Sequence, residues 1–311
     1  MDKPKHISVL LDECIENLNI KPDGIYVDGT LGLGGHSEQI LKRLTTGRLI
    51  GIDRDETAIQ RTGERLKAYA DKMTLVHGNF CDVAQILDEL CVDAVDGMLF
   101  DLGVSSPQLD ESERGFSYMN DAPLDMRMDN TSALTAWNVV NEWPEDELVR
   151  ILRDYGEERF ARRIASRIVE RRADKPVETT LELVDIIKSA MPAAALREKQ
   201  HPAKRSFQAI RIAVNDELGA VEQMMRTAPD KLKIGGRLCV ISFHSLEDRI
   251  VKTSIAAREN GCTCPREAPI CICGFKQTLR SVYRKPILPD EDELNFNPRA
   301  RSAKLRVAER V

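Results

Sequence analysis

The first hundred residues alternate short apolar runs with stretches of helical periodicity. Four runs have the length and the apolar content of buried strands, and they span residues 25–27, 48–53, 73–76 and 96–100. Segments of helix length separate them, such as residues 57–69. Strands that alternate with helices form βαβ units, because parallel strands need crossover connections. The pattern therefore predicts an α/β fold with a parallel sheet.

The pattern changes after Asp101. A polar loop leads into residues 134–195, which have helical periodicity and no strand-like run, and an acid-rich helix start follows Pro144. A single long helix is predicted at 204–226, followed by a fifth strand at 238–242. The helical block is therefore interpreted as an insertion between the fourth and fifth strands. The predicted domains are a sheet domain formed by 1–107 and 204–311, and a helical insert at 108–203.

Composition narrows the class of protein. The 311 residues are 42% hydrophobic and 31% charged, which is typical of a globular chain with a core. The net charge of −5 argues against nucleic-acid binding by bulk electrostatics, although a local basic face remains compatible with it. No apolar run reaches the about 18–20 residues that span a bilayer, and the N-terminus lacks signal-peptide features. We expect a cytoplasmic protein with reduced thiols and no membrane partner.

A glycine-rich turn follows the first predicted strand and reads VDGTLGLGGHS over residues 27–37. Such glycines let the backbone approach a ligand, and the following helix presents unpaired N–H groups. Asp53 ends the second strand, where an acid can accept hydrogen bonds from ribose hydroxyls. Asp28 precedes the glycines and would repel a pyrophosphate, but it could contact an amino group. The turn therefore favours S-adenosylmethionine over a nicotinamide or flavin nucleotide, and a purely structural turn is the third alternative.

Asp101 lies at the carboxyl end of the fourth predicted strand, the edge at which open α/β sheets bind ligands. The methyl group of a sulfonium is already activated, so the protein must mainly align the acceptor. An exocyclic base amine is a weak nucleophile. A carboxylate could accept a hydrogen bond from the amine and assist the departure of its proton. Asp101 is therefore the candidate catalytic residue, and the alternative is a residue that caps the strand or positions the cofactor.

Several long motifs occur in one order along the chain: DGTLGLGGHS, HGNF, DLGVSSPQLD, ERGFSY, PLDMRM, SFHSLEDRIVK and NPRARSAKLRVAER. With them the chain resembles the ribosomal RNA small subunit methyltransferase H family, the bacterial MraW proteins. The resemblance implies a class I S-adenosylmethionine-dependent methyltransferase (Rossmann-like) sheet with an all-helical insert. It also implies N4-methylation of a decoding-centre cytidine (cytidine 1402) in 16S ribosomal RNA. The implied partner is 16S rRNA in the small ribosomal subunit, and a homodimer is expected from the resemblance alone.

The motif match also implies residue roles. The residues implied to bind S-adenosylmethionine are Gly34, Gly35, His36, Asp53, Phe80, Asp101 and Gln108. Many amino-methyltransferases carry two prolines and an aromatic residue after the acid, whereas Asp101 is followed by Leu-Gly-Val. The group that stacks on the target base must then come from elsewhere, and four candidates remain open: Phe116, Tyr118, Phe243 and His244.

Two groups of basic residues and one group of cysteines remain open to two or more interpretations. The basic groups are Arg159, Arg163 and Arg167 on one helix face, and Arg299, Arg301, Lys304 and Arg306 near the C-terminus. Each group could contact RNA phosphates or form a salt-bridged surface. Cys262, Cys264, Cys271 and Cys273 suit a tetrahedral thiolate site, although zinc sites more often use C-x₂₋₄-C spacing. A zinc site, a reduced loop and a disulfide all remain open, and no metal is implied by the resemblance.

Competing functions follow from the same residues. A methyltransferase of similar fold could act on another RNA site or on DNA. A ribosome-assembly factor could retain the fold with a vestigial cofactor site, although Asp53 and Asp101 argue against this. A dehydrogenase would have to bind NAD. A cofactor titration separates these alternatives.

Overall fold

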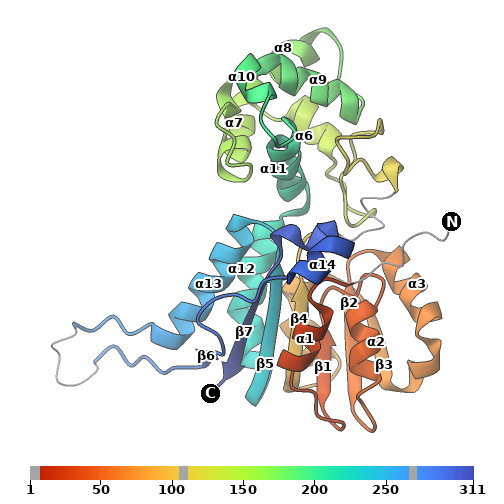
Figure 1. The fold of residues 1–311 in the computed structure, drawn as a ribbon, viewed down its shortest axis with the longest axis vertical. Coiled ribbons are helices and arrows are strands. Elements are labelled where there is room, and N and C mark those ends of the chain that lie inside the picture. The colour runs from red at the N-terminus through yellow and green to blue at the C-terminus, as the bar shows by residue number, and fades with distance from the viewer. Residues whose placement is uncertain (1–7, 105–110, 266–271) are drawn as a thin grey trace. The chain divides into compact units, whose positions relative to one another are not determined.

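The strands of the sheet come from apolar runs in the N-terminal and C-terminal parts of the chain. The computed structural model describes residues 8–104, 111–265 and 272–311. The described strands are β1 (Ile25–Asp28), β2 (Arg48–Asp53), β3 (Met73–His77), β4 (Val95–Asp101), β5 (Leu232–Ser242), β6 (Leu279–Ser281) and β7 (Lys304–Arg310). They form one sheet in the order β3-β2-β1-β4-β5-β7-β6 (Figure 1). The first five strands are parallel, and β7 pairs antiparallel with both β5 and β6. The predicted α/β class is confirmed.

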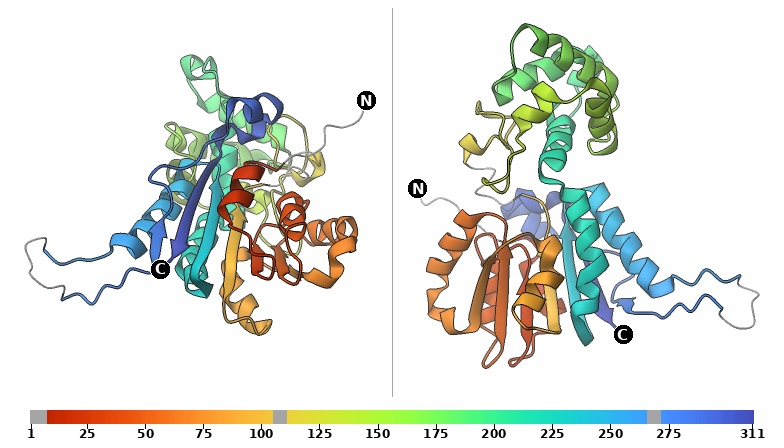
Figure 2. Two further views of the ribbon diagram at one scale, coloured as in Figure 1. Left: turned by 60° about the horizontal axis from the view of Figure 1, so that its bottom comes forward. Right: turned by 180° about the vertical axis from the view of Figure 1, so that it is seen from behind.

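Both faces of the sheet are buried, which explains why its strands read as continuous apolar runs. Successive side chains of a strand point to opposite faces. Met98 and Phe100 pack into one apolar cluster and Leu99 into the other. Figure 1 and the right-hand view of Figure 2 show helices covering these two faces. The helices of this part of the chain are α1 (Leu11–Asn17), α2 (Gly35–Leu41), α3 (Glu56–Arg65), α4 (Val83–Glu89), α12 (Glu217–Thr227), α13 (Ser245–Asn260) and α14 (Glu291–Phe296).

A second compact unit is helical. Its described helices are α6 (Ala136–Glu142), α7 (Glu145–Asp154), α8 (Ala161–Asp174), α9 (Thr180–Ala190), α10 (Ala193–Leu196) and α11 (Lys204–Asn215). Reciprocal capping boxes start α6, between Thr135 and Asn138, and α9, between Thr179 and Glu182. Each box satisfies backbone N–H groups that a helix start would otherwise leave unpaired. The unit has its own core of buried aliphatic and aromatic side chains.

The division of the chain differs in detail from the prediction. The compact units are Val104–Glu217, and Met1–Gly103 together with Leu218–Val311, whereas the predicted insert is 108–203. The predicted helix 204–226 is broken at Asp216, which has a left-handed φ of 46°. Helix α11 belongs to the helical unit because Phe207 and Ile210 are part of its core.

Short 3₁₀ helices complete the described elements: η1 (Lys67–Lys72), η2 (Phe80–Asp82), η3 (Ser112–Arg114), η4 (Ala228–Lys231) and η5 (Pro298–Ser302). Within the described ranges, none of the helices is both long and apolar enough to cross a membrane.

Candidate active site

The glycine-rich turn connects β1 to α2 and crosses the carboxyl ends of the neighbouring strands. The backbone N–H of Gly29 donates to Leu99 O in β4 (2.9 Å), and that of Leu31 donates to Ile52 O in β2 (2.9 Å). The three acids predicted at strand ends, Asp28, Asp53 and Asp101, are the last residues of β1, β2 and β4. Because these strands are adjacent and parallel, the topology brings the three carboxyl groups to one edge of the sheet.

Asp28 holds the turn. Its carboxylate accepts hydrogen bonds from Ser37 Oγ (2.6 Å) and from the backbone N–H of Thr30 (3.2 Å). Burial raises the pKa of Asp28 to about 6, although these two hydrogen bonds oppose the shift. The described contacts of Asp28 are thus internal to the turn, so its main visible role is to shape the loop between β1 and α2.

Two glycines of the turn are required by close packing. A Cβ on Gly29 would lie 2.3 Å from Phe100 Cε1, and a Cβ on Gly34 would lie 2.5 Å from Thr62 Cγ2. Gly34 also has a left-handed φ of 73°, which residues with a side chain rarely adopt. The same turn therefore could not be built from larger residues at these positions.

The residues after the turn are packed against the segment before α1. A Cβ on Gly35 would lie 2.0 Å from Ser8 Oγ. His36 is buried, and its Nε2 lies 3.1 Å from Val9 O. The imidazole of His36, predicted to contact the cofactor, thus contacts the chain's own backbone in this structure. Its assignment to the cofactor stays a prediction.

Asp53 fixes the far side of the turn. Its Oδ2 accepts the N–H of Gly32 (2.7 Å), and its Oδ1 accepts the N–H of Asp55 (2.9 Å). Burial raises the pKa of Asp53, and the hydrogen bonds from Asp55 and Gly32 oppose that shift. Each oxygen retains a lone pair that a ribose hydroxyl could use. Phe80, in η2 just after β3, packs edge-on against Phe100 at 6.0 Å between ring centroids.

Asp101 has the most unusual carboxyl group of the site. Its Oδ1 is buried and has no hydrogen-bond partner among the described residues. Its backbone N–H donates to Thr30 Oγ1 (2.6 Å), which ties the end of β4 to the turn. Burial first, and then the charges of Asp28, Glu247 and Glu293, raise the pKa of Asp101 to about 8.

Thr30 and Glu247 are site residues that the sequence interpretation missed. Glu247 is buried in the first turn of α13 and forms a capping box with His244. Its Oε2 accepts the N–H of Phe243 (2.8 Å), and its Oε1 lies 3.2 Å from His244 Nε2. The spacing of His244 and Glu247 is that of a capping box, so the local contact could have been found. The proximity of Glu247 to Asp101 depends on the fold and has no local signal.

The acids of the site fit a positively charged nucleoside. All three strand-end carboxyl groups have raised pKa values, and the charge of Asp28 contributes to the shift at Asp101. A pyrophosphate would add negative charge at this edge, whereas a sulfonium with an ammonium group would offset the charge already there. The buried oxygen of Asp101, which has no partner in the described part of the chain, and the close-packed glycine turn therefore fit S-adenosylmethionine better than a dinucleotide. Gln108, the remaining predicted cofactor residue, lies outside the described residues.

The candidates for base stacking fall in different environments. Tyr118 stacks on His201 (4.6 Å between centroids, 16° between planes) and meets the edge of Phe207. Phe116 is buried in the core of the helical unit. His244 contacts Glu247 within its own helix turn. None of these contacts identifies the stacking group.

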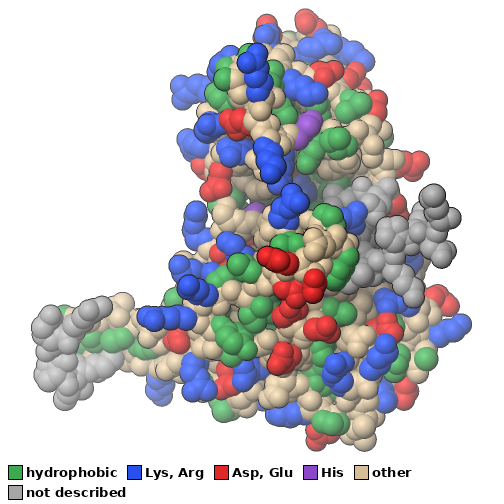
Figure 3. Space-filling view, in the orientation of Figure 1, with side chains coloured by type: hydrophobic (Ala, Val, Ile, Leu, Met, Phe, Trp, Pro, Cys, Tyr) green, Lys and Arg blue, Asp and Glu red, His purple; other side chains and the backbone are tan. Residues whose placement is uncertain are grey.

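Part of each predicted basic face is paired with acids. Arg159 pairs with Glu198 and Arg167 with Glu170, and these four residues are in the helical unit. In the sheet unit, Lys304 and Arg306 of β7 both pair with Asp248. On the face drawn in Figure 3, Lys and Arg side chains are interspersed with Asp and Glu. The cationic character of both faces is therefore weaker than their Arg and Lys content suggests.

Comparisons with known proteins identify the family of the chain. The profile of the MraW methylase family matches residues 3–311. A ribosomal RNA small subunit methyltransferase H from Clostridioides difficile is 55% identical over 307 residues, covering 98% of this chain and 99% of that protein. One of the same description from Brevibacillus brevis is 56% identical and covers 98% of each chain.

Solved structures are more distant in sequence. An rRNA methylase from Streptococcus thermophilus aligns with a TM-score of 0.40 at 14% identity, covering 100% of this chain and 98% of that one. The likeness is too low to support the assignment, which depends on the full-length sequence matches. The observed strand order is that of the class I, Rossmann-like methyltransferase sheet, so the predicted fold class is confirmed. The chain therefore belongs to the MraW methylase family of S-adenosylmethionine-dependent methyltransferases.

Proposed function

We propose that this protein transfers a methyl group from S-adenosylmethionine to 16S rRNA, and that the acceptor is N4 of a decoding-centre cytidine, cytidine 1402. Full-length relatives described as small subunit rRNA methyltransferases support the rRNA substrate. The observation that carries the chemistry is the carboxyl group of Asp101 at the ligand edge of the sheet, which has a buried oxygen without a partner among residues 8–104, 111–265 and 272–311.

The cofactor would be held by residues whose positions the fold has already fixed. Asp53 would accept hydrogen bonds from the ribose hydroxyls, and Phe80 would flank the adenine. The turn from Gly29 to Gly35 would let the backbone approach the amino-acid portion. When bound, S-adenosylmethionine supplies a methyl group that is already activated for transfer. The chain's own residues must then orient the acceptor and exclude water.

Asp101 would act on the acceptor amine. The lone pair of a cytosine N4 is delocalised into the ring, so the amine is a poor nucleophile. A carboxylate that accepts a hydrogen bond from one N–H favours the pyramidal nitrogen of the transition state, and it can receive the proton as the N–C bond forms. This role requires the ionised form of Asp101. The cytosine must leave its stack to reach the edge of the sheet, as in other enzymes that modify bases.

The helical unit is proposed to recognise the RNA. Arg159 and Arg167 of this unit are paired with acids, so recognition would depend on the shape of a folded RNA more than on a continuous basic field. Arg163, an exposed residue of α8, is a candidate phosphate contact.

The test is transfer of labelled methyl groups to small subunits isolated from cells that lack this protein, followed by nucleoside analysis. We expect N4-methylcytidine with the wild type and at least a 100-fold lower rate with Asp101→Asn, about the contribution of general acid–base catalysis. Asp93→Asn is the matched control, because Asp93 is exposed near the amino end of the same strand. Its rate should equal that of the wild type.

The outcomes separate the alternatives. Label in another nucleoside would overturn the cytosine assignment and retain the methyltransferase. Transfer to DNA alone would overturn the rRNA assignment. Binding of S-adenosylmethionine without transfer to any RNA would favour an assembly factor, and binding of NAD in its place would favour a dehydrogenase.

A further inference from the structure

Residues 261–265 and 272–278 form an extended arm between α13 and β6, seen in Figures 1 and 2 as two chain segments that run away from the end of the helix. At its base, the N–H of Thr278 donates to Arg258 O (3.1 Å). Slightly farther out, a Cβ on Gly261 would lie 2.8 Å from the ring of Phe275. Ile272 is 84% exposed. The described part of the arm therefore has little apolar core to hold its two segments together.

Three thiols lie where the two segments face each other. Each of Cys262, Cys264 and Cys273 offers one Sγ atom, and the three atoms all lie within 4.8 Å of one another. The Sγ atoms of Cys262 and Cys273 are 3.6 Å apart. Two thiolates bound to one zinc ion at about 2.3 Å in tetrahedral geometry are about 3.8 Å apart. The observed separation is far longer than the S–S bond of about 2.05 Å and close to that of ligands sharing a metal.

The backbone near these sulfurs also suits a thiolate site. The N–H of Ile272 donates to Cys264 Sγ (3.2 Å). A donor of this kind stabilises the ionised thiolate, as the hydrogen-bonding partners of metal ligands commonly do. Gly274, directly after Cys273, has a left-handed φ of 71°, and no atom of the described residues lies within 4 Å of the position that its Cβ would take, so a glycine lets the chain turn beside the sulfur cluster without strain.

Two of the other described cysteines have different surroundings. Cys14 and Cys239 are buried in the apolar core beside the sheet. Burial raises the pKa of Cys239 to about 12 and places that of Cys14 well above its usual value. Such thiols are inert structural residues. The arm cysteines are exposed or half-buried, so their thiolates can be hydrated and can meet an ion from solution.

We propose that the arm binds a structural Zn²⁺ ion through the thiolates of Cys262, Cys264 and Cys273. A set of three sulfurs selects a soft or borderline ion over Mg²⁺ or Ca²⁺. The sequence offers Cys271 as a fourth donor, but this residue lies outside the described residues and the proposal does not depend on it. The short C-x-C spacing is no obstacle, because the ligands come from two facing segments. The ion would replace the missing core and close the arm, as metals do in other small elements.

The experiment measures metal in the full-length protein, purified under reducing conditions without added metal or chelator. Elemental analysis should find about one zinc per chain, as expected for a single structural site. Titration of the thiols with a mercurial should release the ion to a colorimetric zinc indicator. Replacement by Co²⁺ should give the visible bands of a tetrahedral thiolate site.

Variants then locate the site. Cys262→Ser, Cys264→Ser and Cys273→Ser should each reduce bound zinc at least tenfold. Cys91→Ser, which removes an exposed cysteine elsewhere, should leave the zinc content unchanged. Binding of S-adenosylmethionine, measured on each variant, reports whether the sheet unit remains folded.

Three results would overturn the proposal. The first is a wild-type protein that contains no zinc and also fails to bind Co²⁺ in tetrahedral form. The second is zinc that persists in all three serine variants. The third is iron in place of zinc. The wild-type metal content and the cobalt spectrum decide the matter even if a variant fails to fold.

Discussion

Asp101 keeps a carboxyl oxygen buried without a hydrogen bond from any described residue, an arrangement that costs stability in the folded protein. The residue is also surrounded by the charges of Asp28, Glu247 and Glu293. A neutral side chain of the same shape would avoid the repulsion from these charges, and an apolar side chain would avoid both costs. The presence of an acid here is therefore best explained by what it does for a ligand.

The pH dependence of the free energy of unfolding should show the cost of burying Asp101. The folded-state pKa of Asp101, about 8, lies above its unfolded value near 4, so the folded state binds more protons between these pH values. Stability therefore falls as the pH rises from about 4 to about 8. We expect Asp101→Asn to raise the Tm at pH 9 by at least about 2–4 °C, the shift that 1 kcal/mol produces in a domain of 150–250 residues.

Thermal unfolding of both proteins, without cofactor, at pH 4 and pH 9 checks this expectation. At pH 4 the gain should largely vanish, because Asp101 is then protonated in the folded state and about half protonated in the unfolded state. An unchanged or lower Tm at pH 9 would contradict the account, and Asp93→Asn controls for the loss of one charge.

Gly34 and Gly235 have nearly equal φ angles but different surroundings. Substitutions at the two positions therefore distinguish the cost of close packing from the cost of backbone strain. Gly34 (φ 73°) faces Thr62, whereas Gly235 (φ 79°) has no atom within 4 Å of the position that a Cβ would take. Gly235→Ala should cost about 1–2 kcal/mol of unfolding free energy, the strain of a left-handed residue. Gly34→Ala should cost about 1–3 kcal/mol more, because the space beside it is already filled. Chemical denaturation measures both, and equal costs would refute the packing argument.

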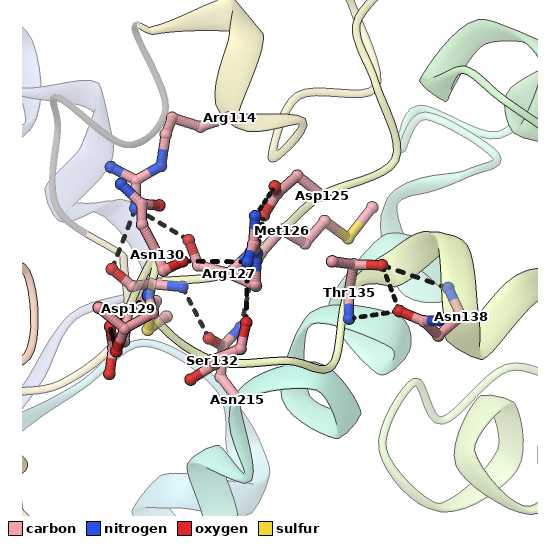
Figure 4. A network of polar contacts seen from close by, with 12 residues as sticks. Arg114, Asp125, Met126, Arg127, Asp129, Asn130, Ser132, Thr135, Asn138 and Asn215 are labelled. Atoms are coloured by element: carbon pink, nitrogen blue, oxygen red, sulfur yellow. Dashed lines mark hydrogen bonds and ion pairs between the residues drawn. The ribbon is translucent and has the colours of Figure 1, made fainter.

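At the scale of elements, α11 anchors the loop that precedes α6. Asn215, the last residue of α11, accepts the N–H of Met128 (2.8 Å) and donates to Met126 O (2.7 Å), as drawn in Figure 4. Arg127 of the same loop pairs with Asp125 (2.7 Å). Met126 has a left-handed φ of 60°, so the loop keeps a strained residue by satisfying its backbone.

Asn215→Ala should therefore destabilise the helical unit by about 2–4 kcal/mol, since it leaves buried backbone groups without partners. The midpoint of urea denaturation measures the effect. Asn120→Ala is the matched control, because Asn120 is exposed and should shift the midpoint little. Equal midpoints for the two variants would show that the Asn215 contacts contribute nothing.

The elements differ in how far they could be predicted from sequence. Strands β1 to β4 were predictable because both of their faces are buried and turns separate them. Strand β7 was missed, because its alternation of Lys304 and Arg306 with apolar residues also fits a basic stripe. The break at Asp216 carries no Gly or Pro signal, because Asp tolerates the left-handed region.

The site was predictable to the same extent as its strands. Asp28, Asp53 and Asp101 were found because each ends a recognisable strand, and parallel strands place their ends together. The buried acid Glu247 could not be found from the sequence, because it acts on Asp101 from a helix more than a hundred residues away in sequence. Electrostatic neighbours of this kind are set by the tertiary fold.

At the scale of the whole molecule, the acids of the site should make the protein sense the charge of its ligand. S-adenosylhomocysteine lacks the positive charge of S-adenosylmethionine. Ionised Asp101 favours the charged ligand, and protonation below about pH 8 removes that preference. The ratio of the two dissociation constants should therefore increase in favour of S-adenosylmethionine as the pH rises from 6 to 9, by up to about tenfold per unit.

Calorimetric titration of both ligands across this pH range measures the ratio. In Asp101→Asn the ratio should be nearly flat, since the titrating group is gone. A wild-type ratio that does not depend on pH would mean that Asp101 does not face the methyl-bearing sulfur.

The central strands of the sheet are separated by the whole helical unit, since β4 ends at Asp101 and its partner β5 begins at Leu232. Domains fold as units during synthesis, and the contiguous residues Val104–Glu217 are made before β5 exists. Until then the apolar strand β4 is an open edge, which is the kind of surface that pairs with other chains. At roughly 5–20 residues per second, this exposure lasts on the order of ten seconds in every round of synthesis. The insertion thus sets a period during which the nascent protein is most in need of protection from aggregation.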